Sequence, residues 1–140
     1  KKDLLKSIKI NDLNNCKVMP LVEPTELNQL LNSADLHIVL QKDGLDNYIL
    51  PSKLTNILGV GGECLVFGSK NSEMFNLDES FPGIIHFISK NNLNKYEFNK
   101  LLARFDDSKI NNIAFKYSRD ELNKDKIMTK YEKYINEKFK

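Results

Sequence analysis

The stretch Pro51-Ser52-Lys53 stands at the head of a short apolar helix pattern and carries residue types that could bind an anion. The first turn of a helix leaves backbone N–H groups unpaired, and the helix dipole adds positive charge there. We predict that Ser52 is the N-cap and that the amides of Leu54 and Thr55 are free to donate. Because Lys53 opposes the dipole unless an anion lies beside it, the stretch predicts a phosphate site. The alternative is an exposed lysine that tolerates its position.

Polar residues near this stretch are further candidates for ligand contacts. Asp46 and Tyr48 lie in the turn-rich segment that leads into the helix, and Asn56 lies one turn after its start. Glu73 stands near the start of the next predicted helix, where it could contact a ligand hydroxyl. Glu73 could equally be a first-turn acid that interacts favourably with the helix dipole.

The histidines and cysteines favour packing roles over chemistry. His37 and His86 fall inside apolar, strand-like runs, where a histidine usually packs against the sheet. Cys16 and Cys64 each lie beside apolar residues, so we expect two reduced, buried thiols. The usual four-ligand zinc site needs more Cys or His than these. The sequence also lacks a Ser-His-Asp arrangement, a phosphate P-loop and a dinucleotide glycine fingerprint.

Length and charge limit the class of protein. The chain has 140 residues and a formal net charge of +2, which fits one domain and gives little reason to expect nucleic-acid binding. No apolar run approaches the roughly 18–20 residues of a membrane span, and no signal peptide opens the chain. We therefore expect a cytoplasmic protein. Contact of its lysine-rich last helix with the inner face of a membrane is an alternative to a simply solvated helix face.

Strand and helix patterns alternate along the chain, which predicts an α/β fold. We expect a Rossmann-like parallel sheet with helices on both faces in residues 1–108, followed by a helical tail of the same domain in 109–140. The predicted strands are 16–22, 35–41, 64–69 and 83–89. The predicted helices are 1–10, one capped by Thr25, 53–60, 71–80, 92–106, 109–118 and 123–139. Ligands of such sheets bind beyond the carboxyl ends of the strands, which is where 53–60 should begin.

Two longer segments resemble a known family. ELNQLLNSADLHIVLQ and LPSKLTNILGVGGECLVFGSKNSEMFNL are similar to the nucleotide-sugar domain of retaining, family-4-type glycosyltransferases. They most resemble the group that builds bacterial capsule, colanic-acid-like and other surface polysaccharides. In that group an ADL strand, a PSKL helix and an A-x-G-x-P-V turn follow one another. The resemblance covers residues 16–135.

The resemblance implies a GT-B enzyme, in which two Rossmann-like domains face each other across a cleft. It implies transfer of a sugar from a nucleotide diphosphate sugar to a polysaccharide or lipid-linked acceptor, with retention at the anomeric carbon and without a metal. Ser52, Lys53 and the Leu54 amide would then stabilise the leaving diphosphate. The candidates for sugar or ribose hydroxyls are Asp46, Tyr48, Asn56 and Glu73.

Several positions depart from the wider family. Its pair of glutamates, eight positions apart, is replaced by Tyr48 and Asn56, and Glu63 stands where the turn usually has proline. The chain resembles only part of the second domain, without the acceptor domain or the first two strands of the donor domain. We expect that it pairs 16–22 with 35–41 directly, exposes sheet edges or needs the missing part, and that it is inactive alone. The alternative is that the chain is the remnant of a degenerate transferase. It would then be a non-catalytic α/β module that binds a nucleotide or a partner protein.

Overall fold

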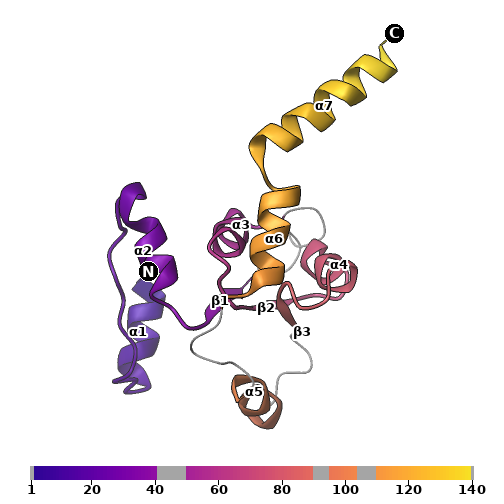
Figure 1. The fold of residues 1–140 in the computed structure, drawn as a ribbon. Helices are drawn as coiled ribbons and strands as arrows, with labels where there is room; N and C mark the ends of the chain where they lie inside the picture. The colour runs from indigo at the N-terminus through magenta and orange to yellow at the C-terminus, as the bar shows by residue number, and fades with distance from the viewer. Residues whose placement is uncertain (1, 41–49, 90–94, 104–109, 140) are drawn as a thin grey trace.

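The computed structural model describes residues 2–40, 50–89, 95–103 and 110–139, which form a Rossmann-like α/β arrangement with C-terminal helices (Figure 1). The sheet has three parallel strands in the order β1-β2-β3. The strands are β1 (His37–Leu40), β2 (Cys64–Gly68) and β3 (His86–Ser89). The helices are α1 (Lys2–Ile10), η1 (Pro24–Glu26), α2 (Leu27–Asn32), α3 (Ser52–Gly59), α4 (Glu73–Ser80), α5 (Lys95–Leu102), α6 (Asn112–Glu121) and α7 (Lys124–Lys138). The predicted fold class is therefore confirmed.

Strand β2 is the centre of the sheet, and all five of its residues are buried. One row of the sheet aligns Val39 of β1, Val66 of β2 and Phe87 of β3. The continuous apolar run of β2 is typical of a parallel strand covered on both faces. In Figure 1, α3, α4 and α6 lie on one side of the sheet, and α5 lies on the other.

The core lies between the sheet and α3, α4 and α6. Helix α3 contributes Leu54 and Leu58, both fully buried, at the four-residue spacing of one helix face. Helix α4 contributes Met74, and α6 contributes Ala114 where it crosses α3. Because Ala114 is small, α6 can approach α3 closely and cover the outer side of the core.

A Schellman motif ends α3. Gly61 has a φ of +68°, its N–H donates to the Leu58 carbonyl, and the Gly62 N–H donates to the Ile57 carbonyl. A Cβ at Gly61 would lie 2.4 Å from Cγ2 of Ile110. Glycine is therefore required there both by the left-handed backbone and by the close approach of the segment before α6.

Two predictions for the N-terminal part are wrong. Residues 16–22 form no strand, and among the described residues β1 pairs only with β2. The chain thus exposes the outer edge of β1, where the side chains of Ile38 and Leu40 are 55% and 74% exposed. Thr25 caps no helix, because it lies inside η1 and α2 begins only at Leu27.

The two thiols differ in exposure, so the prediction of two buried cysteines holds for Cys64 alone. Cys16 is exposed, whereas burial, with a smaller contribution from Glu63, raises the pKa of Cys64 to about 12. The thiolate is the reactive form of cysteine. We therefore expect a thiol-specific reagent to modify Cys16 quickly in the native protein and Cys64 only on unfolding. Mass spectrometry of the labelled chain checks this, and rapid double labelling at neutral pH would contradict it.

Candidate functional site

Two helix N-termini lie on the same edge of the sheet, beyond the carboxyl ends of the strands. In a strand–helix–strand unit the chain runs along the strand, and the helix then returns toward the amino end of the next strand. Helix α3 ends at Gly59, just before β2 begins at Cys64, so its start at Ser52 lies toward the carboxyl edge. Helix α4 starts at Glu73, shortly after β2 ends at Gly68. This edge is where ligands of doubly wound sheets bind.

The backbone at the start of α3 differs from the prediction. Pro51, not Ser52, is the N-cap, with a φ of −61° and a ψ of 132°, and no side chain caps this end. The N–H groups of Leu54 and Thr55 both donate to the Pro51 carbonyl, at 2.9 and 3.4 Å. These two amides are thus not free, because an N-cap carbonyl accepts the first bonds of its helix. The amides without a helix carbonyl to pair with are those of Ser52 and Lys53.

The side chains at this end divide between solvent and core. Ser52, Lys53 and Asn56 are exposed, and spacings of three and four residues place Asn56 above the other two on one face of the helix. The side chain of Leu54 is fully buried in the core. Three of the predicted site residues on α3 therefore lie on one accessible face of the helix, whereas the side chain of the fourth, Leu54, packs in the core. The predicted contacts at Asp46 and Tyr48 lie outside the described residues.

The start of α4 supplies a second set of groups. Ser72 is the N-cap, and its fully buried Oγ accepts a hydrogen bond from the Phe75 N–H at 3.2 Å. Glu73 is exposed and accepts a bond from Nδ2 of Asn76 at 3.4 Å. This geometry is that of a first-turn acid, and it leaves Glu73 in contact with solvent.

Lys70 is a second cation at this edge, and the sequence reasoning above did not single it out. It is exposed in the loop that joins β2 to α4. The signal that could have identified it is its position two residues after the last residue of an apolar strand. A lysine there lies on the same edge of the sheet as Lys53.

The histidines lie at the opposite, amino edge of the sheet. His37 is the first residue of β1, and its Nε2 is buried without a hydrogen-bond partner among the described residues. Burial lowers the pKa of His37, more than its hydrogen bond to the Leu31 backbone raises it. His86 is the first residue of β3, and its Nε2 lies 2.8 Å from Oε2 of Glu63. These positions agree with packing roles, away from the starts of α3 and α4.

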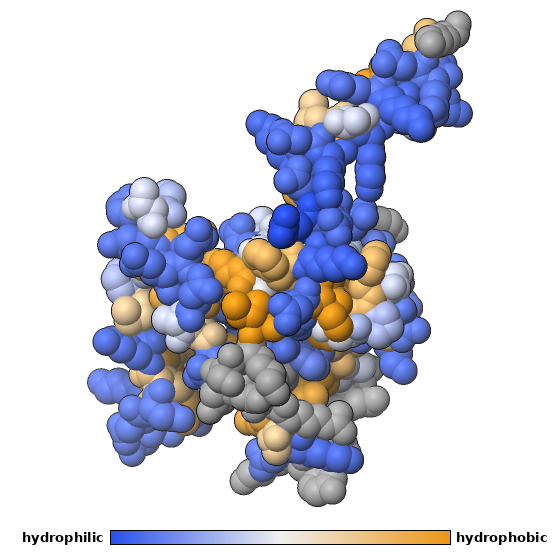
Figure 2. Space-filling view, in the orientation of Figure 1, coloured by the Kyte–Doolittle hydropathy of each residue, from blue (hydrophilic) through white to orange (hydrophobic). Residues whose placement is uncertain are grey.

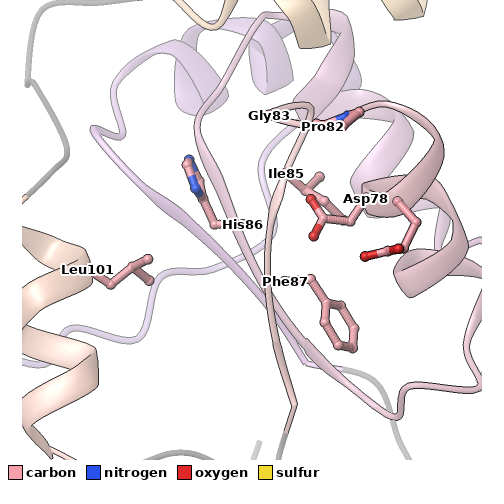
Figure 3. A pocket seen from close by; sticks show the side chains of 8 residues that line it. Asp78, Pro82, Gly83, Ile85, His86, Phe87 and Leu101 are labelled. Atoms are coloured by element: carbon pink, nitrogen blue, oxygen red, sulfur yellow. The ribbon is translucent and has the colours of Figure 1, made fainter.

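A pocket of about 470 Å³ lies beside β3. Figure 3 shows Asp78 and Phe87 on one side of the strand and His86 on the other, toward Leu101 of α5. Burial raises the pKa of Asp78, although nearby His86 acts in the opposite direction. Nowhere in the described part of the chain do three His, Cys, Asp or Glu side chains form a group that could hold a metal ion.

Comparison with known proteins relates the chain to a glycosyltransferase. It is 32% identical over 123 residues to a predicted colanic acid biosynthesis glycosyl transferase, WcaI, of Escherichia coli (strain K12). The match covers 85% of this chain and 29% of that protein, so the chain spans less than a third of the length of this relative. No family model and no solved structure matches the chain. The similarity agrees with the resemblance that the PSKL and ADL segments suggest.

Proposed function

We propose that the chain is the donor-binding portion of a retaining glycosyltransferase with the GT-B arrangement. The whole protein would move a sugar from a nucleotide diphosphate sugar to a polysaccharide or lipid-linked acceptor, on the cytoplasmic side of the membrane. The similarity to a glycosyl transfer enzyme supports the reaction class. The observation that carries the site is the exposed pair Ser52 and Lys53 at the start of α3, on the carboxyl edge of the sheet.

The proposed role of this pair is to stabilise the departing nucleotide diphosphate. When the bond between the anomeric carbon and the diphosphate oxygen breaks, negative charge builds on the diphosphate. The amides of Ser52 and Lys53, which have no helix carbonyl to pair with, can act on that charge. The Ser52 hydroxyl, the Lys53 ammonium group and the helix dipole can act on it as well. Donors fixed in place before the reaction stabilise such a transition state without reorganisation. No metal is needed for this role.

The sugar and ribose contacts are a second part of the proposal. Asn56 lies one turn after Ser52 and Lys53 on the same face of α3, and Glu73 lies at the start of α4. Asp46 and Tyr48 precede α3 in the sequence and complete the set of hydroxyl-binding candidates. The acceptor would bind to parts of the protein beyond this match, so we expect no turnover by these 140 residues alone.

Titration of the isotopically labelled chain with UDP, GDP and inorganic pyrophosphate, followed by NMR, tests the proposal. We expect the amide signals of Ser52, Lys53 and Asn56 to shift with each ligand, and those of α5 to stay in place. Chemical shifts report weak as well as tight binding, so a low affinity of these 140 residues would not hide the effect. Shifts confined to other regions, or none at all, would refute the site.

A further inference from the structure

One buried polar atom has no role in the proposed donor site. Nε2 of His37 is the only buried side-chain nitrogen or oxygen without a hydrogen-bond partner in the described part of the chain. The residue as a whole is partly exposed, but Nε2 itself is not. Buried polar atoms are nearly always paired, because an unpaired one costs free energy. The surroundings of His37 therefore decide which protonation state of the ring the fold accepts.

The other ring nitrogen of His37 joins β1 to α2. The imidazole makes a hydrogen bond to the backbone of Leu31, and because Nε2 has no partner, this bond comes from Nδ1. The bond raises the pKa of His37, as expected where a ring N–H donates to a carbonyl. These contacts assign the neutral tautomer that carries its proton on Nδ1 and a bare lone pair on Nε2.

The edge of the ring that carries Nε2 packs against the turn after α3. A Cβ on Gly62 would lie 2.7 Å from Cδ2 and 2.8 Å from Nε2 of His37. The backbone N–H of His37 donates to the Glu63 carbonyl at 2.9 Å, which fixes the start of β1 beside the same turn. A proton added to Nε2 would thus lie in a closed contact, without an acceptor among the described residues.

The groups that surround this contact carry no negative charge. Leu31 is the neighbour from α2, and Ile57 of α3 lies over Gly62, with its Cγ2 3.1 Å from the position of the added Cβ. The register partner of His37 on β2 is Cys64, whose pKa of about 12 keeps its thiol neutral. The contact is therefore apolar from all three elements.

Two acids lie near His37 in the sequence or across the turn, and neither pairs with its Nε2. The Glu63 carboxylate is bonded to Nε2 of His86 at 2.8 Å and to Nδ2 of Asn111 at 3.3 Å. Asp35, two residues before His37, is exposed. Burial is the largest influence on the pKa of His37 and lowers it from the ordinary value of 6.5.

The N-terminal segment, residues 3–36, has few contacts that hold it on the sheet. None of its residues is buried, and Leu31 is the one that packs against the core. Figure 1 shows α1 and α2 beside the sheet, next to β1. Figure 2 shows mostly polar atoms on the visible face of this segment and apolar atoms beside it, near the start of α6. No described helix, in this segment or elsewhere, is long and apolar enough to cross a membrane.

We propose that His37 is a pH-sensitive contact, which holds the N-terminal segment on the sheet when its ring is neutral and releases the segment when the ring is protonated. A released ring takes up a proton with ordinary affinity, whereas the packed ring resists it, so the open form binds more protons. The stabilising contribution is therefore complete above about pH 6.5 and is lost as the pH falls below that value. The ratio of open to closed chains should rise by up to about tenfold for each pH unit.

NMR of the isotopically labelled full chain between about pH 7.5 and pH 5 tests this proposal. The chain has two histidines, so their ring nitrogens can be assigned and the tautomer of each read directly. At the upper pH we expect the His37 ring to carry its proton on Nδ1. As the pH falls, the amide signals of α2 should move toward unfolded values and exchange faster with solvent, while those of β2 stay in place.

Two variants show which histidine is responsible. His37→Asn keeps a donor at the position of Nδ1 but does not titrate, so its α2 signals should no longer respond to pH. His86→Gln keeps a donor at the position of Nε2 that faces Glu63, and its α2 signals should respond as in the unchanged protein. If His37→Asn does not fold, the ring signals of the unchanged protein still measure the tautomer and the proton uptake.

Three results would overturn the proposal. They are α2 signals that stay constant down to about pH 5, an equal response in His37→Asn, and a His37 ring that titrates at or above its ordinary pKa of 6.5. Nucleotide titration of His37→Asn at about pH 7.5 should match that of the unchanged protein, because His37 lies at the opposite edge of the sheet from the start of α3. The pH proposal and the donor proposal can therefore fail separately.

Discussion

Replacing Lys53 with alanine should weaken nucleotide diphosphate binding by about tenfold or more, which corresponds to roughly 1.4 kcal/mol. In the proposed site, the ammonium group, the helix dipole and the amides of Ser52 and Lys53 would act on the same phosphates, so removal of the cation should lower the affinity directly. Stability should change little or rise slightly, because Lys53 is exposed and opposes the dipole when no anion is bound. NMR titration with UDP and GDP gives the affinities, and thermal unfolding gives the stability.

Two further variants make the Lys53 result specific. Lys53→Arg keeps the charge and should retain most of the affinity. Lys100→Ala removes an exposed lysine from the last turn of α5 and should leave nucleotide binding unchanged. Equal losses in Lys53→Ala and Lys100→Ala would mean that general electrostatic attraction, and not the start of α3, explains the binding.

Replacing Asn111 with alanine should lower the free energy of unfolding by about 2–4 kcal/mol, the sum of a lost N-cap and of buried polar groups left unpaired. The buried side chain of Asn111 accepts a bond from the Ala114 N–H at 2.9 Å. It also donates to the Gly83 carbonyl at 2.9 Å and to Oε2 of Glu63 at 3.3 Å. One residue thus joins α6 to the loop before β3 and to the residue before β2. Denaturant unfolding of the purified variant measures the change.

Asn123 offers a matched control for Asn111. It is the N-cap of α7, and its side chain accepts bonds from the N–H groups of Asp125 and Lys126. Because this cap contacts only its own exposed helix, Asn123→Ala should cost no more than about 1 kcal/mol. Similar losses in both variants would show that Asn111 acts as a helix cap alone and that its contacts across the domain contribute nothing.

The sheet could be predicted largely from apolar runs, because buried parallel strands have a strong local signature. The runs at 35–41, 64–69 and 83–89 contain β1, β2 and β3. The run at 16–22 failed because a strand also needs a neighbour. It includes Pro20, which lacks a donor, and Leu21 is fully exposed. Composition alone cannot tell whether a pairing partner exists.

The start of the helix that carries the proposed site was predicted in position, but its backbone contacts were not. The sequence places a helix start at residues 51–53 and polar side chains on its open face, which the structure confirms. It does not reveal that the Pro51 carbonyl takes both the Leu54 and Thr55 amides, because this depends on backbone geometry.

Polar contacts between residues far apart in the sequence could not be predicted either. Glu63 looked like an isolated departure from a family turn, yet it contacts His86 and Asn111, which are 23 and 48 residues away in sequence. No periodicity links such positions. The start of α6 is affected in the same way, since Asn111 caps this helix and the predicted segment began at 109.

The outer edge of β1 pairs with no other strand in the described part of the chain, and this has a practical consequence for work with this polypeptide alone. The sequence of β1 is His-Ile-Val-Leu. It has no lysine, proline or bulge, the features by which natural proteins prevent an edge strand from pairing with another chain. The exposed side chains of Ile38 and Leu40 add apolar surface beside this edge. Other copies of the chain can therefore add strands to this edge at high concentration, and we expect concentrated samples to aggregate although the core is well packed.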